Sequence, residues 1–586
     1  MLSLLLLSIV MVASVWLCRR IWYERFHRYR QFPQLPSSLL WGHLKIYHEI
    51  AQRGFQDGDH DHIFAQIHET LGRPPVVLFD YRPICRPVLV IASHEVAEQI
   101  SRPSQQFRFS VPKLGLGFLE PVIGHTSILA AEGEEWKALR RTFSPWFSPQ
   151  NLQALVPTVV AQTRGFVAQL DALAGSGDPI PLVTLTTNLM YDIIGAALLD
   201  EDLDAQHLDP RRQSPLVRAF NHLLHAYWDD QIHLPWIFNP VNALRRRRRG
   251  ARVQRLLQSL VRRKHAELQA QTQQTRQDKP PAPRSITALA LHPTTQGPLT
   301  PALLTQTSDQ LRTFLLGGHD SPSATLAWAL YELSRTPRAQ AALHAELDTL
   351  FGEDTRADPT AVQAALAAPT TGPSLLRRMV YLDAVLKETL RLHPPASTAR
   401  YAPGEGGRGG RGEGLTVRLP AGASSTNPTP PESKTLGLDD LILYNCPAII
   451  HRDPAVFGPD AHVFRPERWL GDHDHDHGNN NNNSTTTTTT TNAIPPSAWR
   501  PYERGPRACI GQEFARLVMR VALAVVGRRY AFSKVGLGAV VREAATGRPV
   551  LRPDGQAEVE GVVYTTRQIT ARPVDGLMMT VREMGW

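Results

Sequence analysis

A single cysteine, Cys509, lies in residues 501–515, PYERGPRACIGQEFA, between a loop rich in glycine and arginine and an apolar run. The run that follows, EFARLVMRVALAVVG, has the apolar spacing of a helix. A helix N-terminus favours a nearby anion, and Arg507 adds a positive charge two residues before the cysteine. Gly505 and Gly511 are expected to let backbone N–H groups turn toward the sulfur. Together these features favour a thiolate ligand over a cysteine that is merely buried.

The other cysteines argue against a disulfide framework. The chain has 4 cysteines in 586 residues, and no pair shows the spacing of a metal site. We therefore expect free thiols and a reducing compartment. A composition that is 42% hydrophobic and 20% charged is typical of a globular chain with a large core. The net charge of +9 favours an anionic membrane or an acidic partner, and no motif indicates nucleic-acid binding.

The N-terminus predicts a membrane anchor over residues 1–22. Residues 2–18, LSLLLLSIVMVASVWLC, carry no charge and are followed by Arg19 and Arg20. A cleaved signal peptide is the alternative, but the stretch lacks a basic beginning and a small-residue cleavage site. Because the arginines follow the span, the positive-inside rule places the rest of the chain in the cytosol. Residues 23–45 contain two prolines, Pro33 and Pro36, and are expected to form a linker.

Residues 46–586 are expected to form one catalytic domain, mainly α with small β-sheets. Low-complexity segments near 404–435 and 471–492 interrupt it, and both lack the apolar periodicity needed to bury a core. The second segment contains DHDHDH, where imidazoles alternate with carboxylates. Because homopolymeric Asn and Thr tracts follow this run, we expect it to be solvated low-complexity sequence and not a metal site. The arginine run Arg245–Arg249 has two interpretations, a solvated helix face or a contact with anionic lipid headgroups.

The loop YERGPRACIG resembles the haem-ligand loop of cytochrome P450 enzymes, whose pattern is aromatic-x-x-Gly-x-Arg-x-Cys-x-Gly. The resemblance implies that Cys509 is the metal ligand, bound to the iron of haem b. It also implies that Tyr502, Gly505, Arg507 and Gly511 belong to the cofactor-binding loop. The family usually has phenylalanine at the place of Tyr502, so this chain keeps the ring and adds a hydroxyl.

Two further segments match the family in the expected order. KETLR contains Glu388 and Arg391, and FRPERW contains Arg468. In the family these three charged residues form a buried network that braces the haem pocket. A buried network of charges is costly to break at one member, so Glu388→Ala is expected to give no folded haem protein.

The resemblance also implies residues that bind the haem propionates. In EEWKALRR, Trp136 and Arg140 lie one helical turn apart and face the same way. A planar guanidinium suits a carboxylate, and in the family this pair faces a propionate. Arg400 resembles a second propionate-binding arginine.

A long helical stretch is expected over about residues 302–336. Within it, residues 314–333, FLLGGHDSPSATLAWALYEL, resemble the family's central helix, which crosses the distal face of the haem. There Asp320 and Ser321 are the implied catalytic residues, which relay protons to oxygen bound at the iron. Ser321 stands where the family prefers threonine; it keeps the hydroxyl but loses the methyl that restricts its rotamer, so less efficient coupling is expected. Pro322 lacks an N–H and crowds the carbonyl of Gly318, which predicts a kink at the glycines.

The implied function is a membrane-anchored haem-thiolate monooxygenase, an oxidoreductase of the fungal secondary-metabolism type. It would insert one oxygen atom from O2 into a hydrophobic small molecule. Because no nucleotide or flavin domain is evident, electrons from NADPH would come through a separate flavoprotein, NADPH–cytochrome P450 reductase, with cytochrome b5 as a second candidate partner. The implied location is the endoplasmic reticulum membrane, single-pass, with a cytosolic catalytic domain.

Two alternatives remain open at this stage. One is an isomerase or peroxygenase with the same fold and no reductase, although such relatives often lose the acid–alcohol pair. The other is a non-catalytic haem-binding protein. By family analogy, the substrate pocket draws on four mostly apolar segments: residues 105–128, 216–240, Ala396–Thr398 and Thr570–Met578.

Overall fold

A computed structural model describes residues 2–55, 57–228, 239–274, 285–291, 297–403, 414–420, 435–471, 494–566 and 568–585. The DHDHDH run and most of the two predicted insertions lie outside these residues. Residues 414–420 of the first insertion are described, and the expectation that this segment cannot bury a core is wrong there: Thr416–Arg418 form a strand paired with Thr435–Gly437, and Leu415 and Val417 are buried in a hydrophobic cluster. The chain divides into two compact units. The first consists of Met1–Leu114, Ser397–Val456 and Pro495–Ala508, and the second of Gly115–Ala396, Phe457–Ile494 and Cys509–Trp586.

The first unit begins with the apolar helix α1 (Leu2–Phe26). Its stretch Leu5–Phe26 is long and apolar enough to cross a membrane, and none of it is buried in the protein. At 1.5 Å per residue its 25 residues span about 37 Å, which is more than a bilayer core. The helix therefore suggests a membrane anchor, and it ends four residues beyond the predicted anchor. A second apolar helix, Leu182–Leu199, meets the same criteria but is 89% buried, as a core helix would be.

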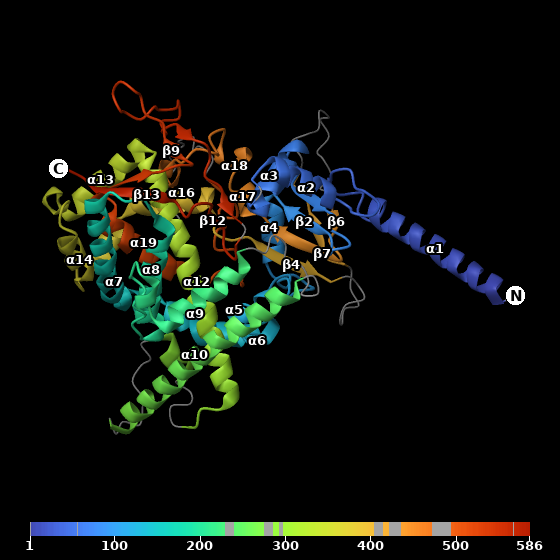
Figure 1. Cartoon of the computed structure of the whole chain (residues 1–586), viewed down its shortest axis with the longest axis horizontal. Helices are drawn as coiled ribbons and strands as arrows, with labels where there is room; N and C mark the ends of the chain where they lie inside the picture. Colours follow the sequence, from blue (N-terminus) through green and yellow to red (C-terminus); the bar gives the residue numbers. More distant parts are fainter. Residues whose placement is uncertain are drawn as a thin grey trace, which may run out of the picture. The chain divides into compact units, whose positions relative to one another are not determined.

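A four-stranded sheet forms the centre of the first unit, in the order β1-β2-β7-β4 (Figure 1). β2 and β7 are parallel, and the other neighbours are antiparallel. Leu89 and Ile91 pack into one hydrophobic cluster and Val88 and Val90 into another, so both faces of the sheet are covered. The sheet strands are β1 (Val76–Phe79), β2 (Val88–Ile91), β4 (Thr398–Ala402) and β7 (Leu441–Asn445). The other elements are α2 (Leu44–Arg53), α3 (His60–Thr70), α4 (His94–Ser101), β5 (Thr416–Arg418), β6 (Thr435–Gly437), α17 (Pro447–Ile450) and α18 (Pro454–Phe457).

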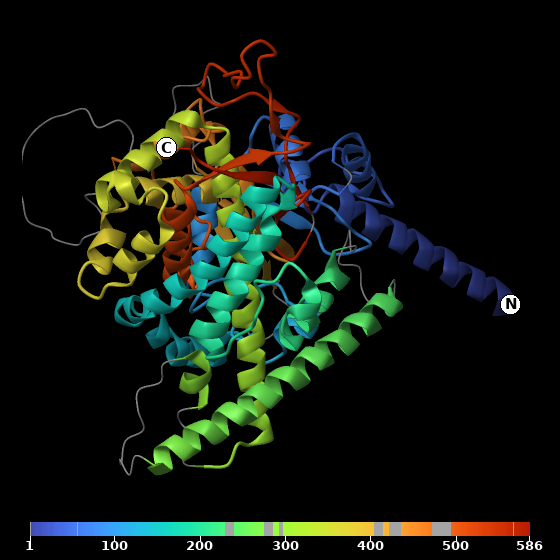
Figure 2. The same cartoon turned by 60° about the vertical axis from the view of Figure 1, so that its left-hand side comes forward.

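The second unit is mainly α and is organised around α12 (Pro301–Ser334), the long helix predicted from the sequence. Thr300 caps it by accepting a hydrogen bond from the N–H of Leu303, and proline occupies the first helical position. The helices that pack directly on α12 include α8 (Leu182–Ile194), α10 (Pro240–Gln274), α16 (Val380–Leu392) and α19 (Gln512–Val526). Figures 1 and 2 show α12 crossing the middle of this unit and α10 lying along its outside.

The remaining elements of the second unit cover this centre. Its other helices and helical turns are η1 (Gly117–Leu119), α5 (Glu120–Ile123), α6 (Gly133–Phe143), η2 (Ser144–Phe147), α7 (Pro149–Ser176), η3 (Gly195–Leu199), η4 (Pro210–Arg212), α9 (Pro215–Leu224), η5 (His225–Tyr227), α11 (Ile286–Leu291), α13 (Pro337–Phe351), η8 (Glu353–Thr355), α14 (Pro359–Ala367), α15 (Gly372–Arg378) and η9 (Pro466–Trp469). Its strands form the sheet β3-β13-β8 and two hairpins: β3 (Ile180–Pro181), β8 (Tyr530–Lys534), β9 (Ala539–Val540), β10 (Val559–Glu560), β11 (Thr565–Thr566), β12 (Arg572–Pro573) and β13 (Met578–Glu583).

Candidate active site

The cysteine of the motif is an exposed free thiol at the start of a helix. Cys509 lies three residues before Gln512, where α19 begins, as the apolar pattern predicted. Gly511 occupies the N-cap position of this helix. The unpaired N–H groups and the positive end of the helix dipole at such a position stabilise a thiolate. All four cysteines of the chain are free, in agreement with the expectation of no disulfides.

The two glycines of the loop differ in what they do. Gly505 has a φ of +75°, and a Cβ there would lie 2.1 Å from the carbonyl oxygen of Ser101 at the end of α4, so only glycine fits. Gly511 has a φ of −88°, a conformation open to any residue, and a Cβ there would lie 3.9 Å from the sulfur of Cys509. The expected conformational role is therefore present at Gly505, whereas at Gly511 the backbone does not require glycine.

Helix α6 carries the predicted pair Trp136 and Arg140. The Trp136 side chain is buried. Burial lowers the pKa of Arg140, and the nearby charge of Cys509 opposes that shift, so the guanidinium and the sulfur lie within electrostatic reach of each other. The predicted pair and the cysteine are thus brought to the same region of the second unit.

The loop residues Tyr502, Gly505 and Arg507 belong to the first unit, and so does Arg400. Arg400 is fully buried on β4. Its guanidinium donates hydrogen bonds to the hydroxyl of Ser110 at 2.8 Å and to the carbonyl of Val111 at 2.6 Å. Arg507 is also buried, and the ring of Tyr502 lies edge-on to Trp499 with centroids 6.0 Å apart. Arg400, Tyr502, Gly505 and Arg507 thus lie in the first unit, whereas Trp136, Arg140, Cys509 and Gly511 lie in the second.

Glu503, which the sequence analysis did not single out, is the central acid of the loop. Its carboxylate lies 4.0 Å from the guanidinium of Arg400 and accepts a hydrogen bond from Arg500 at 2.9 Å. Ser101 and Thr398 also donate to it. Burial alone would raise the pKa of Glu503, but the two arginines and the hydroxyls lower it to about 2. The loop therefore holds a permanent negative charge between two buried arginines.

The middle of α12 has an open face. Gly317 is exposed and a Cβ there would meet nothing within 4 Å, whereas Gly318 is packed tightly enough that a Cβ would lie 2.6 Å from the Ile194 side chain. Ser321, one turn after Gly317, donates its hydroxyl to the Gly317 carbonyl at 3.1 Å. The helix is assigned without interruption through Pro322, and the predicted kink at the glycines stays a prediction.

Aromatic side chains connect this open face with the cysteine. The ring of Phe147 would touch a Cβ at Gly511, and it lies 5.9 Å from the ring of Phe314, which is one turn before Gly317 on α12. The second unit thus places an exposed thiol, a nearby arginine and a bare stretch of helix around one region. These residues fit a flat iron porphyrin ligated by sulfur.

The predicted acid of α12 is bound by an arginine from β12. Asp320 is 3% exposed, and one carboxylate oxygen accepts from Nε of Arg572 at 2.8 Å and from its Nη2. The other oxygen accepts from the hydroxyl of Thr570 at 2.6 Å. Burial by itself would raise the pKa of Asp320, but Arg572 and its other neighbours lower it. The two predicted catalytic residues are adjacent, yet Asp320 bonds to the β12 segment and Ser321 to its own helix.

A small cavity adjoins Asp320. Its volume is about 30 Å³, enough for a water molecule, and its lining includes Asn221, His225, Gln568 and Arg572. Asn221 also accepts a hydrogen bond from the hydroxyl of Tyr191 at 2.8 Å.

His319, the neighbour of Asp320, is completely buried. It stacks on the ring of Tyr191 with centroids 4.1 Å apart, and its Nδ1 lies 2.6 Å from the carbonyl of Leu315. Its Nε2 has no hydrogen-bond partner within the described part of the chain. Burial lowers the pKa of His319 to about 4, although the charge of Asp320 acts in the opposite direction. The imidazole is therefore neutral at neutral pH.

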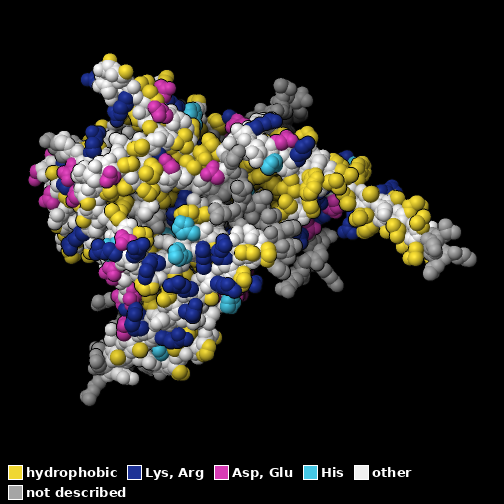
Figure 3. All heavy atoms as spheres, viewed as in Figure 1, with side chains coloured by type: hydrophobic (Ala, Val, Ile, Leu, Met, Phe, Trp, Pro, Cys, Tyr) yellow, Lys and Arg dark blue, Asp and Glu magenta, His cyan; other side chains and the backbone are white. Residues whose placement is uncertain are grey.

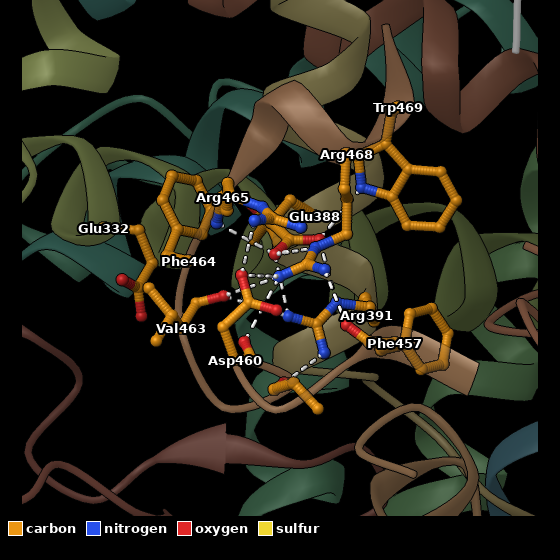
Figure 4. Close-up of polar contacts among 12 residues, drawn as sticks. Glu332, Glu388, Arg391, Phe457, Asp460, Val463, Phe464, Arg465, Arg468 and Trp469 are labelled. Atoms are coloured by element: carbon orange, nitrogen blue, oxygen red, sulfur yellow. Dashed lines mark hydrogen bonds and ion pairs between the residues drawn. The ribbon is translucent and has the colours of Figure 1, made fainter. Parts of the chain in front are cut away.

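The predicted network of Glu388, Arg391 and Arg468 is assembled in the structure (Figure 4). Glu388 is fully buried; it accepts two hydrogen bonds from Arg391, at 2.7 and 2.8 Å, and one from Arg468 at 2.9 Å. Two donors that the sequence analysis missed complete its shell, the indole of Trp469 at 2.9 Å and the backbone N–H of Arg465 at 2.9 Å. The carboxylate is thus bonded from both α16 and the segment containing η9.

The two arginines of this network have further partners in the same segment. Arg391 donates to the carbonyls of Ala461 and Val463. Arg468 donates to the carbonyl of Phe457 at 3.1 Å and lies 3.5 Å from the carboxylate of Asp460. The network therefore fastens residues 457–469 to α16.

Other charged side chains do not form an evident metal site. Within the described ranges, no group of three or more His, Cys, Asp or Glu residues is placed to hold a metal ion. The DHDHDH run lies outside those ranges, so its interpretation as solvated filler stays a prediction.

Comparison with known proteins identifies the family. The model of the cytochrome P450 family matches residues 44–403 and 439–558. Cytochrome P450 monooxygenase acrF of Aspergillus aculeatus is 28% identical over 508 residues, which are 86% of this chain and 93% of that protein. Cytochrome P450 monooxygenase polC of Polytolypa hystricis is 27% identical over 510 residues, 85% of this chain and 81% of that protein. The chain belongs to the cytochrome P450 family.

A third relative is a bifunctional cytochrome P450/NADPH–P450 reductase of Gibberella moniliformis, 26% identical over 444 residues, which cover 75% of this chain and 34% of the relative. Family membership implies haem, and it suggests a redox partner and a small-molecule substrate. It confirms the expected fold class, mainly α with small sheets, and the enzyme class of the monooxygenases.

Proposed function

We propose that the protein is a membrane-anchored haem-thiolate monooxygenase that inserts one atom of O2 into a hydrophobic small molecule. The observation that carries this proposal is the acid–alcohol pair of α12, with Asp320 buried against the β12 segment and Ser321 bonded at the open face, in a chain whose cysteine loop keeps the family pattern. Haem, when bound, supplies the iron that activates O2, and thiolate ligation favours cleavage of the O–O bond.

The ligand roles are assigned to this chain's residues as follows. Cys509 binds the iron, with the N-terminus of α19 stabilising its negative charge. Arg140 and Arg400 hold the propionates, with Trp136 beside the first of them. Glu503 lies 4.0 Å from the Arg400 guanidinium, which hydrogen bonds to Ser110 and Val111 hold in place. The buried loop residue Arg507 adds positive charge two residues from the thiolate.

Asp320 and Ser321 move protons in this proposal. Asp320 is ionised at neutral pH because its pKa is lowered, so it can accept a hydrogen bond from water in the adjoining cavity of about 30 Å³ and take up a proton that the solvent supplies through that water. To pass the proton on, the carboxylate has to loosen its bond to Arg572. The Ser321 hydroxyl, on the open face of α12, receives it there.

The electron donor and the location complete the proposal. A separate NADPH–cytochrome P450 reductase delivers the electrons, and cytochrome b5 is a second candidate donor; the fusion of the two activities in the Gibberella relative supports such a pairing. Because arginines follow the apolar part of α1, we place the anchor in the endoplasmic reticulum membrane with the remainder of the chain in the cytosol. The proposal includes a substrate from fungal secondary metabolism, in keeping with the similarity to two fungal cytochrome P450 monooxygenases.

The test is reconstitution of the full-length protein with a reductase. Apolar compounds from fungal extracts are screened for shifts of the haem absorption, and each hit is incubated with NADPH and isotopically labelled O2. The proposal expects one labelled oxygen atom in the product and no product without the reductase. Turnover with hydrogen peroxide alone would instead indicate a peroxygenase. A haem protein that binds the compounds but turns over none of them would indicate a binding protein.

A further inference from the structure

The cavity of about 30 Å³ that adjoins Asp320 is lined by more polar groups than the proposed proton path uses. They include the side chains of Asn221 on α9 and of Gln568 and Arg572 on the β11–β12 hairpin. The lining extends from the buried Asp320 to His225, which is exposed. Figure 3 shows histidine side chains among basic ones on the face that carries α9 and α10. The cavity therefore lies between the core of the second unit and its surface.

Arg572 brings an unused hydrogen-bond donor to the cavity wall. Its Nε and Nη2 both donate to Asp320. Its Nη1 makes no hydrogen bond to any residue that the structure describes. Because the guanidinium is planar, the two bonds to Asp320 also fix the direction in which Nη1 donates.

Asn221 brings a second donor. Its Oδ1 accepts the hydroxyl of Tyr191 at 2.8 Å, and this bond distinguishes the acceptor end of the amide from the donor end. Tyr191 is fully buried and stacked on His319, so it holds the amide in one orientation. The Nδ2 group of Asn221 has no hydrogen-bond partner within the described ranges.

Gln568 brings an acceptor that lacks a donor. Its Nε2 donates to the hydroxyl of Thr566 at 3.1 Å, whereas its Oε1 is buried and unpartnered in the part of the chain that the structure describes. A buried acceptor without a donor is unfavourable. The terminal torsion of a glutamine side chain is soft, so Oε1 can turn toward a donor in the cavity.

Two donors and one acceptor are the complement of a hydroxyl group, which has two lone pairs to offer and one proton to give. The cavity volume of about 30 Å³ suits a group of the size of water. A carbonyl oxygen would accept from both donors but leave Oε1 of Gln568 unpartnered. A carboxylate would place a second negative charge beside Asp320.

We propose that this cavity binds a hydroxyl group of the substrate, and that the substrate class is an apolar molecule that carries an alcohol. The inference rests on the proposed function and names the polar group of its hydrophobic substrate. The side chains of Leu224 and Ile569, which also line the cavity, suit the hydrocarbon next to the hydroxyl.

The position of the cavity on α12 suits this role. Asp320 lines the cavity and Ser321 follows it on the open face, and consecutive Cα atoms are only about 3.8 Å apart. A hydroxyl bound beside Asp320 therefore keeps the attached carbon skeleton close to that face. An alcohol oxygen accepts and donates hydrogen bonds as water does, so it can take the place of water in the proposed proton path.

The experiment measures binding to the full-length, haem-loaded protein by equilibrium dialysis of radiolabelled probes. Two carbon skeletons are each tested as alcohol, ketone and carboxylate: cyclododecanol, cyclododecanone and cyclododecane carboxylate, and menthol, menthone and menthane carboxylate. For at least one skeleton we expect the alcohol to bind about tenfold more tightly than the ketone and the carboxylate. Alcohols that bind no more tightly than their ketones would overturn the proposal, and so would tighter binding of the carboxylates.

Two variants separate the acceptor from the donors. Gln568→Leu removes the acceptor, so the ratio of alcohol to ketone affinity should fall to about one. Asn221→Leu removes a donor that both groups use, so it should weaken both and keep the ratio; it also keeps the proposal testable if Gln568→Leu does not fold. Gln153→Leu, at an exposed glutamine of α7, is the matched control and should change neither affinity. An unchanged ratio in Gln568→Leu would contradict the proposal, because the preference would then arise elsewhere, for example at the iron.

Dialysis and turnover together distinguish this inference from the proposed function. A preference for alcohols that depends on Gln568, in a protein that forms no oxygenated product, would support the hydroxyl site and contradict the monooxygenase. Oxygenation of ketones as readily as of alcohols, with equal affinities in dialysis, would support the monooxygenase and overturn the hydroxyl site.

Discussion

Glu388 and Asp320 are two of the buried acids of the second unit, and their carboxylates are held differently. Glu388 is bonded by Arg391, Arg468, Trp469 and a backbone N–H, so its carboxylate is enclosed by donors from two segments. Among the described residues, the Asp320 carboxylate is bonded only by Arg572 and Thr570 of the β12 segment, and a cavity adjoins it. A carboxylate enclosed on all sides braces the fold, whereas one held from one side with room beside it can change partners. The difference supports the proposal that Glu388 stabilises the fold and that Asp320 takes part in proton transfer.

The largest expected effect is the loss of the enclosed acid. Glu388→Ala leaves two buried arginines without their shared carboxylate, which should cost about 3–5 kcal/mol of unfolding free energy. We expect little or no folded haem protein, measured by thermal unfolding and by haem content. Glu135→Ala, which removes an exposed glutamate of α6, is the control and should behave as the wild type. Wild-type stability and haem content in Glu388→Ala would show that the network does not brace the pocket.

The second prediction removes the partner of the one-sided acid. Arg572→Ala takes away a charged hydrogen-bond donor and should cost about 2 kcal/mol, less than Glu388→Ala. It should also change the amount of product formed per NADPH, because Asp320 loses the group that lowers its pKa. Thr570→Val, which removes a neutral donor from the same carboxylate, should have a smaller effect on both measurements.

The pH dependence of Arg572→Ala sharpens this test. In the wild type the folded-state pKa of Asp320 is lowered, so the ion pair stabilises the fold above the ordinary carboxyl pKa. This contribution is lost as the pH falls through the folded-state pKa. Thermal unfolding of Arg572→Ala should therefore lose less stability than the wild type on acidification below about pH 4. If the stability of the wild type and of Arg572→Ala fell equally with pH, the ion pair would contribute nothing to the loss of stability in acid.

A third prediction concerns the buried imidazole beside Asp320. The pKa of His319 is lowered to about 4, so between pH 6.5 and 4 the unfolded chain binds a proton there that the folded chain does not. The fold loses stability as the pH falls in this window, by about 1 kcal/mol at pH 5.5. His319→Phe should remove this part of the slope in thermal unfolding from about pH 7 to 5.5, and an unchanged slope would contradict it.

The smallest effect is expected at the alcohol. Ser321 donates to the carbonyl of Gly317 and lacks the methyl that would restrict its rotamer. Ser321→Thr should raise the product formed per NADPH modestly and leave thermal stability close to that of the wild type. Ser321→Ala is the matched control, because it removes the hydroxyl and should lower the same ratio. An unchanged ratio in Ser321→Thr would defeat the idea that serine weakens coupling.

Local patterns predicted the framework of the site well. The periodicity of residues 302–336 gave α12 (Pro301–Ser334) within two residues at each end, and the apolar run after Cys509 gave α19. The motifs around Glu388, Arg391 and Arg468 predicted a network that the structure assembles. Such features depend on neighbours within a few turns or on short motifs, so a single sequence contains them.

The partners of the functional acids could not be predicted in the same way. Arg572 is 252 residues from Asp320, and Glu503 meets Arg400 because a loop packs on a strand more than 100 residues away. No local pattern indicates such pairs, since they depend on how the elements pack. The arginine run of α10 could be predicted only in part. Its spacing divides the helix into two faces, but only the structure shows that the face with Gly250 packs on Pro121 of α5.

The most direct test of the account is the absorption spectrum of the reduced protein with carbon monoxide, recorded for the wild type and for Cys509→Ala at equal protein concentration. We expect the band diagnostic of thiolate-ligated haem in the wild type, and its complete absence in the variant even where haem is retained. The same band in Cys509→Ala would contradict the assignment of Cys509 as the iron ligand and, with it, the proposed monooxygenase.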